Sequence, residues 1–219
     1  MISRALVLFG ASFALAACER SATGDPAPVT PQTAAAIDDT AAFASPPPPS
    51  AAPSRSSPAK PPLVAEAVVL GEWGKADNRA SCAPLAFAAT GQARGAPRAA
   101  DFGGGWGVAF DLPNLRSAYG IAGPGPVAAD SAPAEAQRDR LREQWPHFRE
   151  LTALPQPAFA GYGIEGAAAY PADNPAGRGV NSLAYLRVGG QQCTYNVWSR
   201  LGRSHLETLL DALRPVPVE

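Results

Sequence analysis

The chain has 219 residues and is almost neutral, with 18 Lys and Arg against 19 Asp and Glu. This balance excludes a strongly basic nucleic-acid binder and a polyacidic tail, so we expect no nucleic acid among its partners. Two histidines and three cysteines leave little material for a zinc or iron–sulfur site, and we expect no cofactor and no metal. The 24 prolines and 21 glycines indicate a substantial unstructured part.

The first residues predict a secretory signal peptide over residues 1–17. A single Arg4 precedes an uncharged apolar run from Ala5 to Ala16. As a helix, this run spans about 18 Å, which is too short for a hydrocarbon core of about 30 Å. One positive charge, a short apolar run and then small residues are typical of signal peptides.

The end of the apolar run, Leu15-Ala16-Ala17-Cys18, resembles the lipobox of bacterial lipoproteins. The resemblance implies cleavage before Cys18 and acylation of both its thiol and the new amino terminus. Glu19 follows, whereas an aspartate there usually marks inner-membrane retention in Gram-negative lipoproteins. The resemblance therefore implies a lipid anchor on the periplasmic face of the outer membrane. Two or three acyl chains anchor stably, since each buried CH₂ contributes about 0.8 kcal/mol.

Residues 18–62 are predicted to be the lipidated cysteine and a disordered tether. The tether is dominated by Pro, Ala, Ser and Thr, and its only larger apolar residues are Val29, Ile37 and Phe43. Such a segment cannot bury enough apolar surface to offset its chain entropy. Residues 63–219 are long enough to form one domain with a core of its own.

This domain is predicted to be α+β, with a mostly antiparallel sheet and about two helices. Strands are expected at 63–73, 85–89, 105–112, 117–123 and 162–170. The segment Leu63–Leu70 favours a helix equally well, because Ala65-Glu66-Ala67 is helix-friendly. A helix is predicted over Ala134–Trp145, with Pro146 ending it and Leu141, Trp145 and Phe148 facing inward.

A hairpin is the clearest predicted element. Ser182–Val188 and Gln191–Trp198 flank Gly189-Gly190, a pair that suits a two-residue turn. That turn places Leu186 opposite Cys193 and Ala184 opposite Tyr195, which makes one face of the hairpin apolar.

A last helix is predicted to follow the hairpin. Ser204 and Glu207 fit a capping box, with Ser204 as the N-cap. An apolar stripe follows at helical spacing and Pro215 ends the helix. The stripe consists of Leu206, Leu209, Leu210 and Leu213.

The second face of the hairpin is the candidate binding patch. Aromatic rings together with amide groups on an exposed surface suit a sugar or a protein partner. The alternative is that the last helix or another segment covers this face, since Leu183 shares it. The patch consists of Tyr185, Arg187, Gln192, Asn196 and Trp198.

The cysteines predict one disulfide. With Cys18 acylated, Cys82 and Cys193 are the two that remain. In an oxidising compartment such a pair is expected to be joined.

No motif in the sequence marks a catalytic residue. Residues 161–166 match G-x-G-x-x-G, but Pro171 leaves no room for the helix that would hold a phosphate, so these glycines favour close packing instead. The carboxylate pairs Glu165 with Asp173 and Asp101 with Asp111 could serve a glycosidase geometrically. Surface carboxylates are the more common explanation.

A second resemblance concerns residues 71–87. Gly71-Glu72-Trp73, followed by Cys82-Ala83-Pro84-Leu85-Ala86-Phe87, resembles the opening of small periplasmic inhibitors of secreted metalloproteases. This resemblance implies a small all-β barrel and an inhibitory role. The domain predicted here is larger and contains helices.

We therefore expect a lipid-anchored periplasmic protein that is not an enzyme and has a binding or envelope-support role. Its partner would be an envelope protein or a glycan. A protease inhibitor and an envelope hydrolase with an unmarked active site are the alternatives.

Cys18→Ser is expected to abolish lipidation and to leave a longer, uncleaved precursor, because the acylated thiol is lost. Metabolic labelling with a palmitate analogue, followed by intact-mass measurement, checks both effects. Label retained on the Cys18→Ser variant would contradict the lipobox interpretation.

Overall fold

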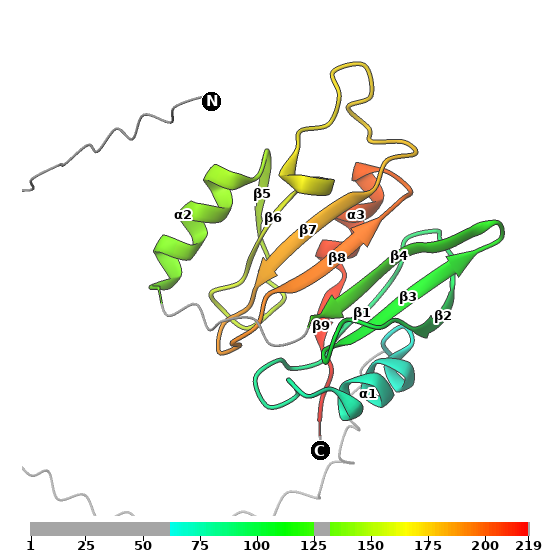
Figure 1. Cartoon of the computed structure of the whole chain (residues 1–219), viewed down its shortest axis with the longest axis vertical. Coiled ribbons are helices and arrows are strands. Elements are labelled where there is room, and N and C mark those ends of the chain that lie inside the picture. The colour runs from blue at the N-terminus through cyan, green and yellow to red at the C-terminus, as the bar shows by residue number, and fades with distance from the viewer. Residues whose placement is uncertain (1–61, 125–131, 219) are drawn as a thin grey trace, which may run out of the picture. The chain divides into compact units, whose positions relative to one another are not determined.

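A seven-stranded antiparallel sheet dominates the computed structural model, which describes residues 62–124 and 132–218. Two short strands pair separately, and three helices complete the described part (Figure 1). The predicted α+β class with a mostly antiparallel sheet is confirmed. In spatial order, the strands of the main sheet are β2 (Ala96–Ala99), β3 (Trp106–Leu112), β4 (Leu115–Gly123), β8 (Tyr195–Ser199), β7 (Ser182–Arg187), β6 (Phe159–Ile164) and β5 (His147–Glu150).

The remaining elements are the strand pair β1 (Leu85–Phe87) with β9 (Leu213–Pro215), and the helices α1 (Glu66–Lys75), α2 (Ala134–Gln144) and α3 (Arg203–Asp211). All described residues belong to the unit Ser56–Glu219. The predicted signal peptide, Cys18 and the tether up to residue 61 lie outside the described residues. No helix in the described ranges is long and apolar enough to cross a membrane.

The two faces of the sheet are covered differently. Strand side chains alternate between the faces, and one face, here the inner face, packs Val108, Ile121 and Val197 into the main core. Helices α1 and α3 and the β1–β9 pair contribute to this same core. On the outer face, α2 packs over β5 and β6 in a small cluster of Leu141, Trp145 and Phe159. Figure 1 shows α3 behind β7 and β8, and α2 beside β5 and β6.

Three sequence predictions need correction at the level of elements. Residues 63–73 were predicted as a strand, with a helix over Leu63–Leu70 as the alternative. The structure has a helix here, and the strand prediction failed because a short apolar run has no diagnostic period. The predicted strand 162–170 is shifted to 159–164, and the 3-10 turn Glu165–Ala167 ends it with positive φ at Gly166 and Ala167. The short strands β2, β5 and β9 were not predicted.

Helix α2 matches its prediction, whereas the cap of α3 differs. Leu141 and Trp145 are buried as expected, and α2 ends at Gln144, just before Trp145 and Pro146. Helix α3 begins at Arg203 with Gly202 (φ 99°) as its N-cap, so Ser204 is not the cap. The Glu207 carboxylate reaches Arg203 and Tyr162 instead of the helix terminus. The four leucines of the stripe are buried, although Leu213 already belongs to β9.

The hairpin of β7 and β8 has the predicted faces but a different register. Leu186 pairs with Tyr195, and Ala184 with Val197, which shifts the pairing by two residues. A shift of two keeps every side chain on its predicted face. Val188 still accepts a hydrogen bond from Gln191 across Gly189-Gly190, but β8 starts only at Tyr195.

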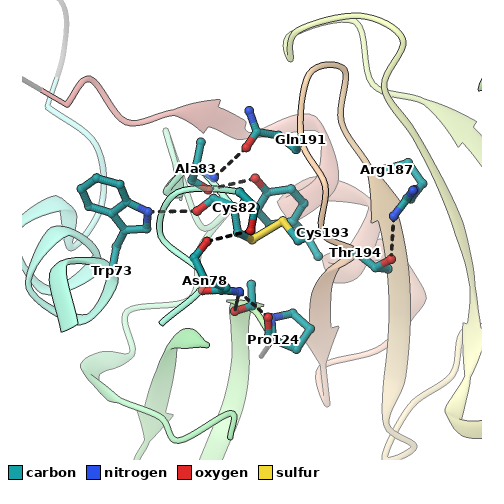
Figure 2. Close-up of a disulfide and its surroundings, with 12 residues drawn as sticks. Trp73, Asn78, Cys82, Ala83, Pro124, Arg187, Gln191, Cys193 and Thr194 are labelled. Carbon is teal, nitrogen blue, oxygen red and sulfur yellow. Dashed lines mark hydrogen bonds between the residues drawn. A yellow bond between two sulfur atoms is a disulfide. The ribbon is translucent and has the colours of Figure 1, made fainter. Parts of the chain in front are cut away.

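The reason for the longer connection is the disulfide between Cys82 and Cys193, which confirms the predicted pairing (Figure 2). Their Cα atoms are 5.4 Å apart and 111 positions apart in the chain. Next to the bond, Gln191 accepts from the Ala83 N–H at 2.8 Å, and Gln192 donates to the Ser81 carbonyl at 2.9 Å. The loop therefore pairs with residues 81–83 rather than with its own hairpin.

Reduction of the purified chain is expected to lower its melting temperature by roughly 5–15 °C. A native disulfide contributes about 2–5 kcal/mol, and 1 kcal/mol corresponds to roughly 2–4 °C in a domain of this size. Thermal unfolding followed by circular dichroism, with and without reductant, measures the effect. A Cys82→Ala/Cys193→Ala variant is the control and should not respond to reductant. Two free thiols in the oxidised protein would contradict the bond.

Candidate functional site

The outer faces of β7 and β8 form the centre of the candidate site. Inward residues such as Ala184, Leu186 and Val197 are fully buried, whereas their outward neighbours are partly exposed. This alternation places four residues of the predicted patch, Tyr185, Arg187, Asn196 and Trp198, on the side away from the core. The outward residues are Leu183, Tyr185, Arg187, Asn196 and Trp198.

Tyr185 and Arg187 face a pocket of about 720 Å³ between α2 and β7. The Trp145 ring lies 5.3 Å from the Tyr185 ring, centroid to centroid, and with Leu141 and Leu183 it gives the pocket apolar walls. Arg187 donates to Gln137 of α2 at 2.7 Å and to Thr194 at 3.1 Å, so its guanidinium is held at the rim. We call this cavity the α2 pocket.

Asn196 and Trp198 face a second pocket, of about 510 Å³, across β8 from the first. The loop between β2 and β3 brings Phe102 to 5.7 Å from Trp198, centroid to centroid. The indole N–H of Trp198 donates to the Ser117 carbonyl at 3.3 Å. Polar walls come from Arg98, Asp101, Asn181 and Arg200. We call this cavity the Phe102 pocket.

Leu183 lines both pockets, so they adjoin on the outer face, and we call the two together the outer-face groove. Gln192 lines a smaller cavity beside Gly189 and Pro157, which shares Gln137 and Arg187 with the α2 pocket. The five residues of the predicted patch therefore line three cavities, of which the first two form the groove. Helix α3 does not cover this face, because its leucines belong to the main core. Helix α2 and the Phe102 loop cover parts of the face, which agrees with the predicted alternative of cover by another segment.

Glycines on the outer face determine where the aromatic rings lie. A Cβ on Gly120 would lie 2.2 Å from the Trp198 ring, and one on Gly161 would lie 2.5 Å from the Trp145 ring. Only the missing side chains allow these indoles to lie against the strands. The glycines of the G-x-G-x-x-G match therefore serve close packing, here against the end of α2.

Asp111 anchors the wall of the Phe102 pocket. The Ser117 N–H donates to its carboxylate at 2.7 Å, and Arg98 donates at 2.9 Å. The Ser117 hydrogen bond, assisted by Arg98, holds the pKa of Asp111 below its usual range. The Asp111 carboxylate is thus paired with Arg98, whereas Asp101 lines the Phe102 pocket and Glu165 lines the α2 pocket.

A Ser–His contact exists on the inner side of the fold. The His205 Nε2 donates to the Thr90 carbonyl at 3.3 Å, so its Nδ1 accepts from the Ser199 hydroxyl at 2.9 Å. Burial lowers the pKa of His205, although the Thr90 carbonyl opposes this effect. Ser199 is fully buried, so a substrate cannot reach its hydroxyl. The pair ties α3 to β8.

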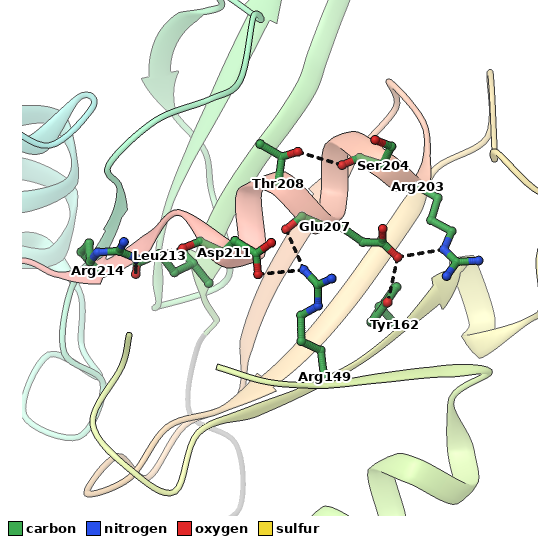
Figure 3. Close-up of polar contacts among 9 residues, drawn as sticks. All are labelled: Arg149, Tyr162, Arg203, Ser204, Glu207, Thr208, Asp211, Leu213 and Arg214. Carbon is green, nitrogen blue, oxygen red and sulfur yellow. Dashed lines mark hydrogen bonds and ion pairs between the residues drawn. The ribbon is translucent and has the colours of Figure 1, made fainter. Parts of the chain in front are cut away.

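The Glu207 carboxylate is the centre of another polar cluster on α3 (Figure 3). It accepts from Arg203 and from the Tyr162 hydroxyl, both at 2.8 Å. Partial burial alone would raise the pKa of Glu207, but these hydrogen bonds hold it below its usual range. Arg149 of β5 donates to Asp211 at 2.8 Å. These contacts join α3 to β5 and β6.

Within residues 62–124 and 132–218, no group of three or more His, Cys, Asp or Glu side chains could hold a metal ion. Sequence reasoning missed Phe102, Trp145 and Asn181, which reach the groove from three separate segments. The available signal was the pair Gly107 and Gly120, since a glycine inside a strand marks a close approach. No protein-family model, curated protein or solved structure shows significant similarity to the chain.

Gly161→Ala is expected to lower the free energy of unfolding by about 1–3 kcal/mol, because the added Cβ would displace the Trp145 ring. Gly71→Ala is the matched control. No atom lies within 4 Å of the added Cβ there, and an alanine inside a helix is expected to add about 0.5–1 kcal/mol. Denaturant unfolding of both variants measures the difference. Equal stability of Gly161→Ala and the parent would contradict the packing of Trp145 on β6.

Proposed function

We propose that this chain is a lipid-anchored periplasmic binding protein that holds an extended envelope ligand in the outer-face groove, and that it is not an enzyme. The lipobox supports the anchor and the compartment. The groove supports the binding role, because two pockets with aromatic and polar walls join at Leu183. Concave sites with apolar walls and a few placed polar groups are the usual form of ligand sites.

One observation carries the proposal more than any other. The outward side chains of β7 and β8 are partly exposed between two segments that cover the sheet on either side, α2 and the Phe102 loop. A face meant only for packing would be closed between these segments. The groove therefore provides a rigid floor of paired strands, which suits a ligand that lies across it.

Neither alternative function gains support from the structure. The residues that resemble the metalloprotease inhibitors lie in helix α1, in the following loop and in β1. Three helices and a seven-stranded sheet differ from the small all-β barrel that this resemblance implies. The hydrolase alternative has a Ser–His pair in Ser199 and His205, but the hydroxyl is enclosed.

Leu183→Glu is expected to weaken binding to Gram-negative envelopes at least fivefold, since it places a charge where the two pockets meet. The test mixes the full lipoprotein, kept in detergent micelles, with detergent-washed envelopes and measures the bound fraction by cosedimentation. Leu201→Glu is the matched control, because Leu201 is exposed and lies outside the groove.

Circular dichroism first establishes that both variants are folded, and Asn196→Arg replaces Leu183→Glu if that variant is not. Absence of binding by the parent, or equal binding by the groove variant, would contradict the proposed function.

A further inference from the structure

The groove carries two aromatic pairs, one in each pocket. Trp198 and Phe102 meet at an interplanar angle of 38°, and Trp145 and Tyr185 at 42°. In each pair, the indole lies against a strand glycine, so it is fixed by the backbone. Sugar rings have an apolar C–H face and polar edges, and they pack on such fixed aromatic surfaces. Two pairs in one groove suit a chain of at least two sugar units.

Amide groups stand beside the first aromatic pair. Asn181 and Asn196 line the Phe102 pocket, and their side-chain oxygens are buried without a hydrogen-bond donor among the described residues. Buried polar groups without a partner are uncommon in folded proteins and call for an explanation. Hydroxyl and acetamido groups supply both donors and acceptors to an amide. The Phe102 pocket thus has two amide side chains beside a ring surface.

The charge of the groove differs from that of the chain. Four arginines line it together with the carboxylates of Asp101 and Glu165, and Asp111 pairs with one of the arginines, Arg98, at 2.9 Å. The whole chain has a net charge of −1. A cleft lined mostly by one sign of charge attracts ligands of the opposite sign. Guanidinium groups match the geometry of carboxylates. The four arginines are Arg98, Arg140, Arg187 and Arg200.

We propose that the groove binds an acidic glycan, a sugar chain that carries both carboxylate and N-acetyl groups. This inference rests on the proposed binding function and names its ligand class. One sugar unit lies on Trp198 and Phe102 beside Asn181 and Asn196. The chain then crosses Leu183, and a further unit lies against Tyr185, whose ring is backed by the buried Trp145. The arginines of the rim meet the carboxylates.

The test uses the full lipoprotein in detergent micelles and three labelled probes in fluorescence anisotropy. The probes are a hyaluronan octasaccharide, which alternates N-acetylglucosamine with glucuronic acid, neutral chitohexaose, and an octaglutamate peptide. We expect the hyaluronan probe to bind at least tenfold more tightly than either of the others. Its affinity should fall as salt is raised, because the rim arginines are near the surface.

Variants assign the binding to the groove. Trp198→Ala should weaken hyaluronan binding at least fivefold, and Trp198→Phe, which keeps a ring, should retain most of it. Arg200→Ser should weaken binding about threefold to tenfold. Arg94→Ser is its matched control and should bind hyaluronan like the parent. Arg94 is also exposed, but it lies on the loop after β1, away from the groove. This loop approaches α3 through Gly91.

Three outcomes would overturn the glycan inference. Octaglutamate binding as tightly as hyaluronan would show a site for acidic peptides instead. Hyaluronan binding that is unchanged in Trp198→Ala and Arg200→Ser would place the sugar outside the groove. Binding of washed envelopes that depends on Leu183, without binding of either sugar, would refute the glycan and leave the proposed function standing. Loss of envelope binding as well would refute both.

Discussion

The tie between residues 81–83 and the loop 188–194 is the constraint on which the groove depends. The Cys82–Cys193 bond holds this loop beside the start of the domain, and the Tyr195 hydroxyl donates to the Ala83 carbonyl at 2.9 Å. Because the loop is held there, β8 begins at Tyr195 and Thr194 meets Arg187. The same bond therefore stabilises the core on one side of the sheet and positions a charged rim residue on the other.

The outer face forms a groove because its small residues lie on the flanking strands and its large residues on the central ones. Gly107 and Gly120 in β3 and β4, and Gly161 in β6, let Phe102, Trp198 and Trp145 approach the backbone. The rings thereby become walls rather than a continuous layer. Between them, β7 and β8 present longer side chains that have no covering helix. A groove with a rigid floor results from where the glycines stand, without any gap in the main core.

Local patterns predicted what depends on local structure. The alternation of apolar and polar residues along 182–198 correctly predicted the two faces of the hairpin. Pro146 and the spacing of Leu141 and Trp145 correctly predicted α2. The register of the hairpin could not be predicted, because it is set by Cys82 more than a hundred residues away. The division of the predicted patch between separate cavities could not be predicted either, because α2 and the Phe102 loop reach it from distant parts of the sequence. In α1, the short apolar run fits both the helical period of 3.6 residues and the strand period of two residues. The helix is therefore favoured by its packing against β3 and not by its own sequence.

The polar contacts on the two sides of the sheet differ. On the inner side, the titratable side chains are held by hydrogen bonds between elements of the fold. His205 bonds to Ser199 and to the Thr90 carbonyl, and Glu207 bonds to Arg203 and Tyr162. Each hydrogen bond restricts a side chain that would have to be mobile to transfer a proton or to attack a carbonyl carbon. On the outer side, Asn181 and Asn196 line the Phe102 pocket beside rings fixed by backbone glycines. Fixed surfaces favour recognition, because a rigid site loses little conformational entropy when its ligand binds.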